Sequence, residues 1–318
     1  MSNNTIFVTG GAGFIGSHLC TLLVGKGENV ICIDNLVTGN KDNIESLLNE
    51  SNFTFINADI REKEWIQELK LEELHEIYDL ASPASVTRIT EHPIEAATVN
   101  AVGLLNLLDL AVKHKAKLLF ASSSEAYGDP KEHPQKESYW GNVNPVGVRS
   151  GYDEGKRFGE SLCMAYMREK GISVRIARIF NTYGPNSDPN DSRVIPSMVT
   201  RALRGLSIHV HGDGQQTRSF CYVSDLVDGL VKLMKSDESM PVNLGNPDEY
   251  TILKIAQLIK EATKSSSEIK FTERPADDPS RREPDISKAK QVLGWEPTVS
   301  LRTGILETIR YFTSKNGQ

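Results

Sequence analysis

The chain has 318 residues, of which 39% are hydrophobic and 25% are charged, and its formal net charge is −6 at pH 7. That composition is ordinary for a soluble globular protein, and the length suits one large domain or two closely associated ones. Non-specific nucleic-acid binding depends on clustered lysine and arginine, so an acidic chain without a basic block argues against it.

The sequence predicts neither a secretion signal nor a membrane span. The N-terminus enters the apolar run 5–9 without the basic and apolar regions of a signal peptide. The most apolar helical segment, 104–112, is interrupted by Asn106 and Asp109 and is too short to cross a bilayer. The cysteines form no CxxC pair and are expected to be buried reduced thiols: Cys20, Cys32, Cys163 and Cys221. A cytoplasmic location is therefore expected, with no membrane partner.

Short apolar runs alternate with amphipathic segments over the first part of the chain. Strands are expected at 5–9, 29–33, 53–57, 76–80, 117–122 and 173–179, and helices at 14–25, about 41–49, about 62–70, 93–114 and 152–170. Apolar strands separated by helices are typical of a parallel sheet covered on both faces. We therefore predict an α/β fold built on a Rossmann-type doubly wound sheet.

After Asn181 the pattern changes to short elements separated by turn-rich segments. We expect a first domain over residues 1–180, to which segments around 215–240 return. Residues 181–318 are expected to form mainly a smaller, loop-rich lobe that binds substrate.

A glycine-rich turn follows the first predicted strand. Gly10, Gly13 and Gly16 stand between that strand and the next helix, where backbone and helix N-terminus can approach a pyrophosphate. Asp34 ends the second strand, 18 residues after Gly16, where its carboxylate can bind both ribose hydroxyls and would repel a 2′-phosphate. Asp59 follows the third strand and is expected near the adenine. The pattern predicts NAD rather than NADP; the alternative is a tight turn in which Asp34 caps a loop.

Tyr152 and Lys156 lie four residues apart at the start of a predicted helix and so share one face. A nearby ammonium and a cationic nicotinamide both favour the phenolate, which could accept a proton from a sugar hydroxyl. Ser123 and Glu125 follow an upstream strand whose end is expected to face the same crevice. Alone, the tyrosine–lysine spacing could equally mark a solvated helix face.

The histidines predict no metal site, because their spacing provides no ligand set with cysteine or acidic residues: His114, His133, His209 and His211.

The glycine turn, Asp34 and the Tyr152/Lys156 pair resemble those of the extended short-chain dehydrogenase/reductases, which include nucleotide-sugar epimerases, dehydratases and decarboxylases. Several runs are similar to the UDP-glucuronate decarboxylases within that family, and together they cover nearly the whole chain: 122–130, 133–145, 149–157, 178–185, 212–227, 242–247 and 277–297. Runs 133–157 and 277–297 distinguish the decarboxylases from the related enzymes, which share the other runs.

This resemblance implies NAD-dependent conversion of UDP-glucuronate to UDP-xylose through a 4-keto intermediate, with the cofactor regenerated. It implies that Tyr152 is the base, that Lys156 depresses the tyrosine pKa and holds the nicotinamide ribose, and that Ser123 positions the C4 oxygen. Glu125 and Arg282 are assigned to the carboxyl region and the proton step at C5. Arginine suits bidentate contact with a carboxylate; an exposed Arg281–Arg282 pair is the alternative.

The resemblance also implies binding residues and an assembly. NAD is expected to be lined by Gly10, Gly13, Phe14, Ile15, Gly16, Asp34, Asn35, Thr38, Gly39, Asp59, Ile60, Leu80, Ala81, Asn100, Tyr152 and Lys156. The UDP-sugar is expected to contact Ser85, Asn181, Arg193, Arg218 and Arg282. A homodimer is expected through helices 93–114 and 152–170, which carry apolar residues on more than one face. The chain departs from its relatives at Ser123, where they carry threonine, and at 86–89 beside the expected sugar pocket.

Three other functions stay open. A nucleotide-sugar 4-epimerase shares the oxidation at C4, although Arg282 and the run 133–145 argue against it. A 4,6-dehydratase would carry an Asp-Glu pair where this chain has Ser124 before Glu125. A non-catalytic dinucleotide-binding protein should have lost part of the set Ser123, Tyr152 and Lys156, yet all three are present.

Overall fold

The computed structural model describes residues 4–69, 71–273 and 282–316. The chain divides into two compact units by its internal contacts. The first comprises residues 1–126, 144–178 and 230–242, and the second comprises 127–143, 179–229 and 243–318. The division thus assigns 127–143 and 215–229 to the second unit, and of the segment around 215–240 that was expected to return, only 230–240 lies in the first.

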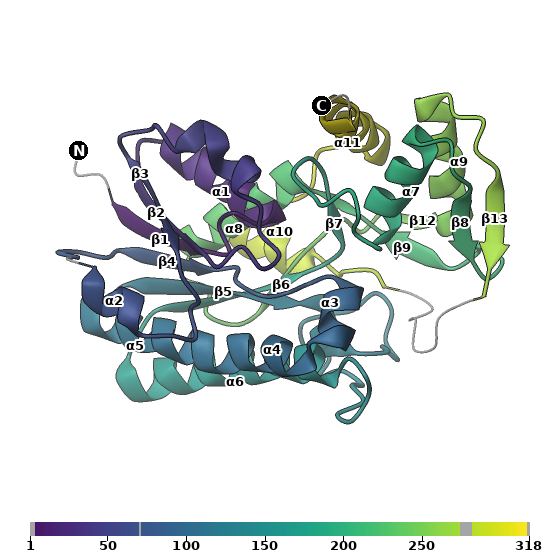
Figure 1. Cartoon of the computed structure of the whole chain (residues 1–318). Helices are drawn as coiled ribbons and strands as arrows, with labels where there is room; N and C mark the ends of the chain where they lie inside the picture. Colours follow the sequence, from purple (N-terminus) through teal and green to yellow (C-terminus); the bar gives the residue numbers. More distant parts are fainter. Residues whose placement is uncertain (1–3, 70, 274–281, 317–318) are drawn as a thin grey trace. The chain divides into compact units, whose positions relative to one another are not determined.

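The elements follow one another in the order labelled in Figure 1. The first part of the chain contains β1 (Thr5–Thr9), α1 (Phe14–Gly25), β2 (Asn29–Asp34), η1 (Lys41–Leu47), β3 (Phe53–Asn57), α2 (Glu64–Glu68), β4 (Glu76–Asp79), α3 (Val86–Glu91), α4 (Pro93–Thr98), η2 (Val99–Gly103), α5 (Leu104–His114), β5 (Lys117–Ser123), η3 (Ser124–Tyr127), α6 (Ser150–Lys170) and β6 (Val174–Ile179). There follow β7 (Thr182–Tyr183), α7 (Val194–Leu203), β8 (Ile208–His211), β9 (Thr217–Ser219), β10 (Cys221–Tyr222), α8 (Val223–Lys235), β11 (Val242–Leu244), β12 (Glu249–Thr251), α9 (Ile252–Thr263), β13 (Ile269–Thr272), α10 (Ser287–Leu293) and α11 (Leu301–Asn316).

A seven-stranded sheet in the order β11-β6-β5-β4-β1-β2-β3 supports the first unit. The neighbouring pairs from β5 to β3 are parallel, and α1 lies on the opposite face from α4, α5 and α6 (Figure 1). Strand side chains such as Phe7, Ile77 and Leu118 are fully buried, which explains their continuous apolar runs. The predicted Rossmann-type sheet is confirmed.

The run Pro93–His114 is continuous helix, composed of α4, the π-helical turn η2 and α5. Among the described residues it is the helix long and apolar enough to span a membrane, with a mean hydropathy of 1.3, and 56% of that window is buried within the protein. Leu104, Leu107 and Leu108 belong to the core of the first unit, so its apolar character is that of a core helix.

The second unit has its own core and smaller sheets. β8 and β13 pair in parallel, whereas β9 and β12 pair antiparallel. Helices α7, α9 and α11 pack around a buried cluster that includes Ile195, Ile255 and Ile305. This independent core explains how turn-rich sequence after Asn181 still folds compactly.

Local differences from the sequence prediction fall in polar segments. The helix expected at about 41–49 is the 3₁₀-helix η1, and the one expected at about 62–70 is only the five-residue α2. Helix α3 was not anticipated; its N-cap is Ser85, whose hydroxyl accepts a hydrogen bond from the Arg88 amide at 3.3 Å. Side-chain capping therefore gives helix to a segment that lacks an apolar period.

Candidate active site

The glycine turn brings main-chain atoms close together at the carboxyl end of β1. Gly10 has a positive φ of 66°, and a Cβ atom there would lie 2.7 Å from the Leu80 carbonyl oxygen. A Cβ at Gly16 would lie 2.1 Å from the Gly10 carbonyl oxygen. Only glycine fits both positions, and the tight turn leaves Phe14 and Ile15 in the first turn of α1. The cradle therefore fits a dinucleotide pyrophosphate.

Asp34 ends β2 with its carboxylate beside this turn. It accepts hydrogen bonds from the Ala12 amide at 3.0 Å and the Leu36 amide at 2.9 Å, and burial raises its pKa while these amides lower it. A Cβ at Gly39 would lie 2.6 Å from Asp34 Oδ1, so the next loop passes tightly over the carboxylate. The Asp34 carboxylate is thus held by main-chain amides at the end of β2, beside the glycine turn.

Asp59 is engaged by its neighbours. Arg61 pairs with it at 2.5 Å and Asn35 Nδ2 donates to it at 3.0 Å. The hydrogen bond from Arg61 is the main reason why the Asp59 pKa falls to about 2. An acid held in this way stays ionised and orients the Asn35 amide at the edge of the same loop.

Asn100 lies in the π-helical turn η2 and is 1% exposed. Its Nδ2 donates to the Ala96 carbonyl at 2.7 Å and the Ser82 hydroxyl at 3.0 Å, whereas its Oδ1 has no hydrogen-bond partner among the described residues. π-Helical turns are common at functional sites. A buried acceptor without a donor is costly, so this oxygen is consistent with a ligand contact.

Tyr152 and Lys156 are both buried on the inward face of α6. Lys156 Nζ donates to the Ala121 carbonyl at 2.7 Å and lies 5.6 Å from the centre of the Tyr152 ring. Burial lowers the Lys156 pKa to about 8, opposed by the negative charge of Asp79. The alternative of a solvated helix face is thereby removed.

In the protein alone, the Tyr152 pKa is raised, not depressed. Burial raises it to about 12, and a hydrogen bond with the Ser123 side chain is the largest opposing effect. The sequence analysis expected the Lys156 ammonium and a cationic nicotinamide together to favour the phenolate; without the cofactor, desolvation of the phenolate dominates. Ser123 is confirmed as a neighbour of Tyr152, and Asp79 is a buried acid that the sequence reasoning missed.

Glu125 is paired with Arg149, a residue that the sequence analysis did not single out. The guanidinium lies 2.9 Å from the Glu125 carboxylate and 4.0 Å from that of Asp153. Arg149 immediately precedes α6, so a charge just before the tyrosine helix sets the carboxylate that follows β5. The signal for Arg149 was its place three residues before Tyr152.

The other residues of the first unit that were predicted to bind NAD take part in core packing, main-chain hydrogen bonds or the loop after β2. Ile60 is buried in the core, and a Cβ at Gly103 would lie 2.6 Å from it. The Leu80 amide donates to the Thr9 carbonyl and the Ala81 amide to Asp79 Oδ1, at 3.1 and 3.3 Å. Thr38 lies in the loop that passes over Asp34.

In the second unit, three of the predicted substrate residues contact neighbours within that unit. Arg218 on β9 is buried and donates to the Thr217 carbonyl at 2.8 Å. Arg193 pairs with Asp191 at 2.6 Å just before α7. Asn181 Nδ2 approaches the Ser219 carbonyl at 3.5 Å.

Arg282 is only 5% exposed, which excludes the alternative of an exposed pair at this residue. Its Nη2 approaches the Gly128 carbonyl at 3.4 Å, and its own carbonyl accepts from Ser219 Oγ at 3.4 Å. Arg281 and the rest of 277–281 lie outside the described residues. Two of the discriminating sequence runs meet here, because Gln135 forms a parallel bridge with Pro284.

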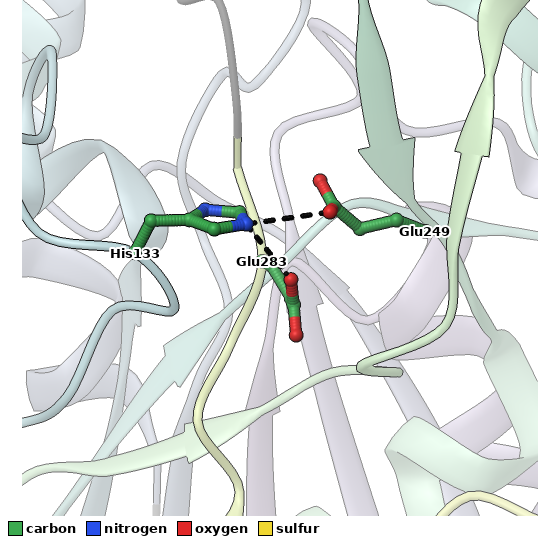
Figure 2. Close-up of side chains that lie close together, drawn as sticks. All are labelled: His133, Glu249 and Glu283. Atoms are coloured by element: carbon green, nitrogen blue, oxygen red, sulfur yellow. Dashed lines mark ion pairs between the residues drawn. The ribbon is translucent and has the colours of Figure 1, made fainter.

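A histidine and two glutamates also meet in the second unit (Figure 2). His133 Nε2 lies 3.0 Å from the Glu283 carboxylate and 3.3 Å from that of Glu249. Thr217 Oγ1 donates to Glu249 at 2.6 Å, and burial together with the nearby Glu249 charge raises the Glu283 pKa. The sequence analysis expected no metal-ligand set from the spacing of the histidines, and spacing alone did not reveal this group, whose members are 34 residues or more apart. The side chains of His133, Glu249 and Glu283 are partly exposed and form an ion-pair cluster.

Comparison with known proteins places these geometries in context. The sequence model of the family described as GDP-mannose 4,6 dehydratase matches residues 7–308. The chain is 52% identical over 308 residues to UDP-glucuronic acid decarboxylase 1 of Danio rerio, which covers 97% of this chain and 72% of that protein. Among solved structures, it resembles UDP-glucose 4-epimerase from Thermotoga maritima with UDP-glucose (33% identity, TM-score 0.91, 98% and 99% of the two chains). It also resembles UDP-glucuronic acid 4-epimerase from Bacillus cereus in complex with UDP-glucuronic acid and NAD (29% identity, TM-score 0.86, 98% and 99%).

Proposed function

We propose that this chain, which belongs to the GDP-mannose 4,6-dehydratase family, is an NAD-dependent lyase that decarboxylates UDP-glucuronate to UDP-xylose. The observation that carries the proposal is the 52% identity to a UDP-glucuronic acid decarboxylase across 97% of the chain. The solved epimerases are 28–33% identical, which matches a shared fold and a shared oxidation step better than a shared product.

The residues proposed to act at C4 of the sugar are Tyr152, Lys156 and Ser123, all in the first unit. The glycine turn and Asp34 would hold NAD, which would supply the hydride acceptor for C4 and, once reduced, the hydride donor; its positive charge would favour the Tyr152 phenolate. Tyr152 takes the proton of the C4 hydroxyl and later gives it back. Ser123 donates a hydrogen bond to the C4 oxygen, and Lys156, anchored on the Ala121 carbonyl, holds the nicotinamide ribose.

Loss of CO₂ follows from the position of the ketone. A C4 ketone is β to the C6 carboxylate, so the C5–C6 bond breaks with its electrons passing to the C4 oxygen as an enolate. Protonation at C5 and reduction at C4 then give the pentose, with no net redox change. We assign Arg282 to the carboxylate and Glu125, set by Arg149, to the proton step at C5.

The other binding roles are proposed on the same basis. Asp34 binds the adenosine ribose, Asn35 and Asp59 lie toward the adenine, and Asn100 Oδ1 faces the cofactor. Asn181, Arg193 and Arg218 bind the diphosphate and nucleoside of UDP. Ser85, which caps α3, contributes its main chain and hydroxyl at the sugar.

A homodimer is supported by apolar side chains exposed on the helical face of the first unit. Ile94, Val102, Leu105 and Phe158 belong to Pro93–His114 and α6, and Ile94 is 78% exposed. Exposed apolar patches of this kind mark interaction sites. Light scattering at micromolar concentration should give the dimer mass, and Phe158→Glu should shift it toward monomer; a monomeric wild-type chain refutes the dimer.

The proposed location is the cytoplasm. The four cysteines are free and buried, which suits a reducing compartment.

Incubation with UDP-glucuronate and catalytic NAD⁺, followed by mass spectrometry, tests the function. A UDP-pentose formed with loss of CO₂ supports it. A product of unchanged mass with inverted C4 identifies a 4-epimerase instead.

A further inference from the structure

The residue that follows Arg282 is bonded to a buried glutamine, Gln135, from a distant part of the chain. We propose that Gln135 is a positioning residue for Arg282 and thereby couples oxidation at C4 to loss of CO₂. This inference rests on the proposed function, since it assigns a purpose to the arginine of that site.

Gln135 is fully buried and grips the residue that follows Arg282. Its amide donates to the Glu283 carbonyl at 2.9 Å, while its Oε1 accepts from the Glu283 amide at 2.9 Å. Its carbonyl accepts from the Asp285 amide, also at 2.9 Å, and its Nε2 donates to the Glu132 carbonyl at 2.7 Å. Both peptide groups of Glu283 are therefore fixed by one glutamine, immediately beside Arg282.

A second buried amide locks Gln135 in place. Asn243 is fully buried, and its Nδ2 donates to the Gln135 and Asp285 carbonyls, each at 3.0 Å. Its Oδ1 accepts from the Tyr127 hydroxyl at 2.7 Å. The segment around Arg282 is thus held by a network in which each side-chain polar atom of Gln135 and Asn243 has a partner, and such networks are rigid.

The network reaches the guanidinium at its other end. Tyr127 begins the segment 127–143, and the next residue, Gly128, offers the carbonyl that Arg282 Nη2 approaches at 3.4 Å. Gln135, seven residues after Gly128, bonds to the main chain beside the same arginine. One segment therefore sets both the origin and the direction of the Arg282 side chain.

This geometry matters more for decarboxylation than for oxidation. The C5–C6 bond must align with the C4 carbonyl as CO₂ leaves, and a displaced arginine would lose that alignment while Tyr152 still removes the C4 proton. A displacement of about 1 Å can cost about 10²-fold in rate. The oxidised sugar would then accumulate with the reduced cofactor before CO₂ is lost.

The experiment uses the full-length protein, saturated with UDP-glucuronate and NAD⁺, and the variant Gln135→Leu. We expect kcat to fall by about 10²-fold with KM changed less than about threefold. The steady-state absorbance of the reduced nicotinamide should rise above that of the wild type. Tyr127→Phe, which removes one hydrogen bond of the network and keeps the ring, should shift both readouts in the same direction by a smaller factor.

The control is Asp225→Asn in the same unit. Asp225 accepts from the Thr298 and Val299 amides at 3.0 and 2.8 Å, a comparable buried link to another segment. It should lower stability without raising the reduced-cofactor signal. If Asp225→Asn and Gln135→Leu raise that signal equally, or neither does, the positioning role is refuted.

A double-mutant cycle separates positioning from general damage. In an Arg282→Lys background, Gln135→Leu should lower kcat by less than about threefold further, because the group it positions is already altered. Full additivity of the two losses would overturn the inference. Wild-type turnover to UDP-xylose in the same assay tests the proposed function separately, so either proposal can fail without the other.

Discussion

Lys156 in the first unit and Asn243 in the second are both almost completely buried, yet they meet different surroundings. Lys156 makes one main-chain hydrogen bond, and burial lowers its pKa to about 8. Asn243 bonds through both polar atoms of its side chain to three partners. The first unit also contains Tyr152, whose pKa burial raises to about 12, and Asn100, whose Oδ1 has no partner among the described residues.

The difference separates two uses of a buried polar group. A buried charge with few partners lowers the stability of the protein, but its protonation can change. A bound ligand can offset that cost by supplying the missing interactions. A neutral amide with every atom bonded cannot change protonation and holds geometry instead. We infer that the first unit supplies proton transfer and the second supplies position.

The largest expected effect comes from Tyr152→Phe. Loss of the base should lower kcat by about 10³- to 10⁴-fold while NAD still binds, since the phenol acts on the substrate. Tyr183→Phe is a matched control, because that buried phenol bonds to the Leu301 carbonyl in the second unit. Steady-state kinetics and NAD titration measure both; retained turnover in Tyr152→Phe contradicts the proposed base.

Asn243→Leu should lower the stability of the second unit, whereas Tyr152→Phe lowers kcat. Three partners would be left buried without Asn243, and we expect the free energy of unfolding to fall by about 3 kcal/mol. Urea denaturation of the variant and the wild type measures the change. A loss below about 0.5 kcal/mol would mean that the network contributes little stability.

Lys156→Met, unlike Asn243→Leu, should raise the free energy of unfolding of the ligand-free protein. The pKa falls from 10.5 to about 8, which at 1.36 kcal/mol per unit costs at most about 3 kcal/mol at pH 7. Subtracting about 1 kcal/mol for the lost hydrogen bond leaves a gain of about 2 kcal/mol.

The sign of the pH dependence follows from the depressed pKa. Between pH 8 and 10.5 the unfolded chain binds the extra proton, so wild-type stability rises with pH and the advantage of Lys156→Met narrows. Lys170→Met, exposed on the same helix, is the control and should show no such window. An advantage that is constant across this range would contradict the assigned cause.

The smallest effect is expected for Ser123→Thr. The hydroxyl is retained and a methyl restricts χ1, so kcat should stay within about threefold of the wild type. Ser123→Ala should lose more, about tenfold, because the hydrogen bond to the C4 oxygen disappears. Equal rates for the alanine and threonine variants would remove Ser123 from the site.

Sequence patterns predicted the core of the fold well and the polar segments poorly. Strands and core helices such as α1 and α6 follow their predicted ranges within two residues, because burial imposes a period on the sequence. Helix α3 was missed because a cap, not an apolar face, starts it.

The residues of the candidate site also differ in how far the sequence predicts them. The glycine turn, Asp34, Tyr152 and Lys156 are found from local spacing. Asp79 was missed because nothing in the sequence shows which charges meet, and Arg149 was missed although it lies only three residues before Tyr152. The contacts of His133 with Glu249 and Glu283, and of Gln135 with Glu283, join residues more than 100 positions apart, and only the folded chain brings them together.

The assignment of 127–143 to the second unit and of 230–242 to the first has a consequence for synthesis. A nascent chain that has reached residue 180 lacks β11, the edge strand of the large sheet, and the Asp285 amide that completes the bonds of Gln135. Synthesis therefore passes residue 180 before the chain has supplied 230–242 to the first unit and most of the residues of the second. We therefore expect a fragment cut at residue 180, which lacks β11, to be less stable to urea than the first unit of the full-length chain.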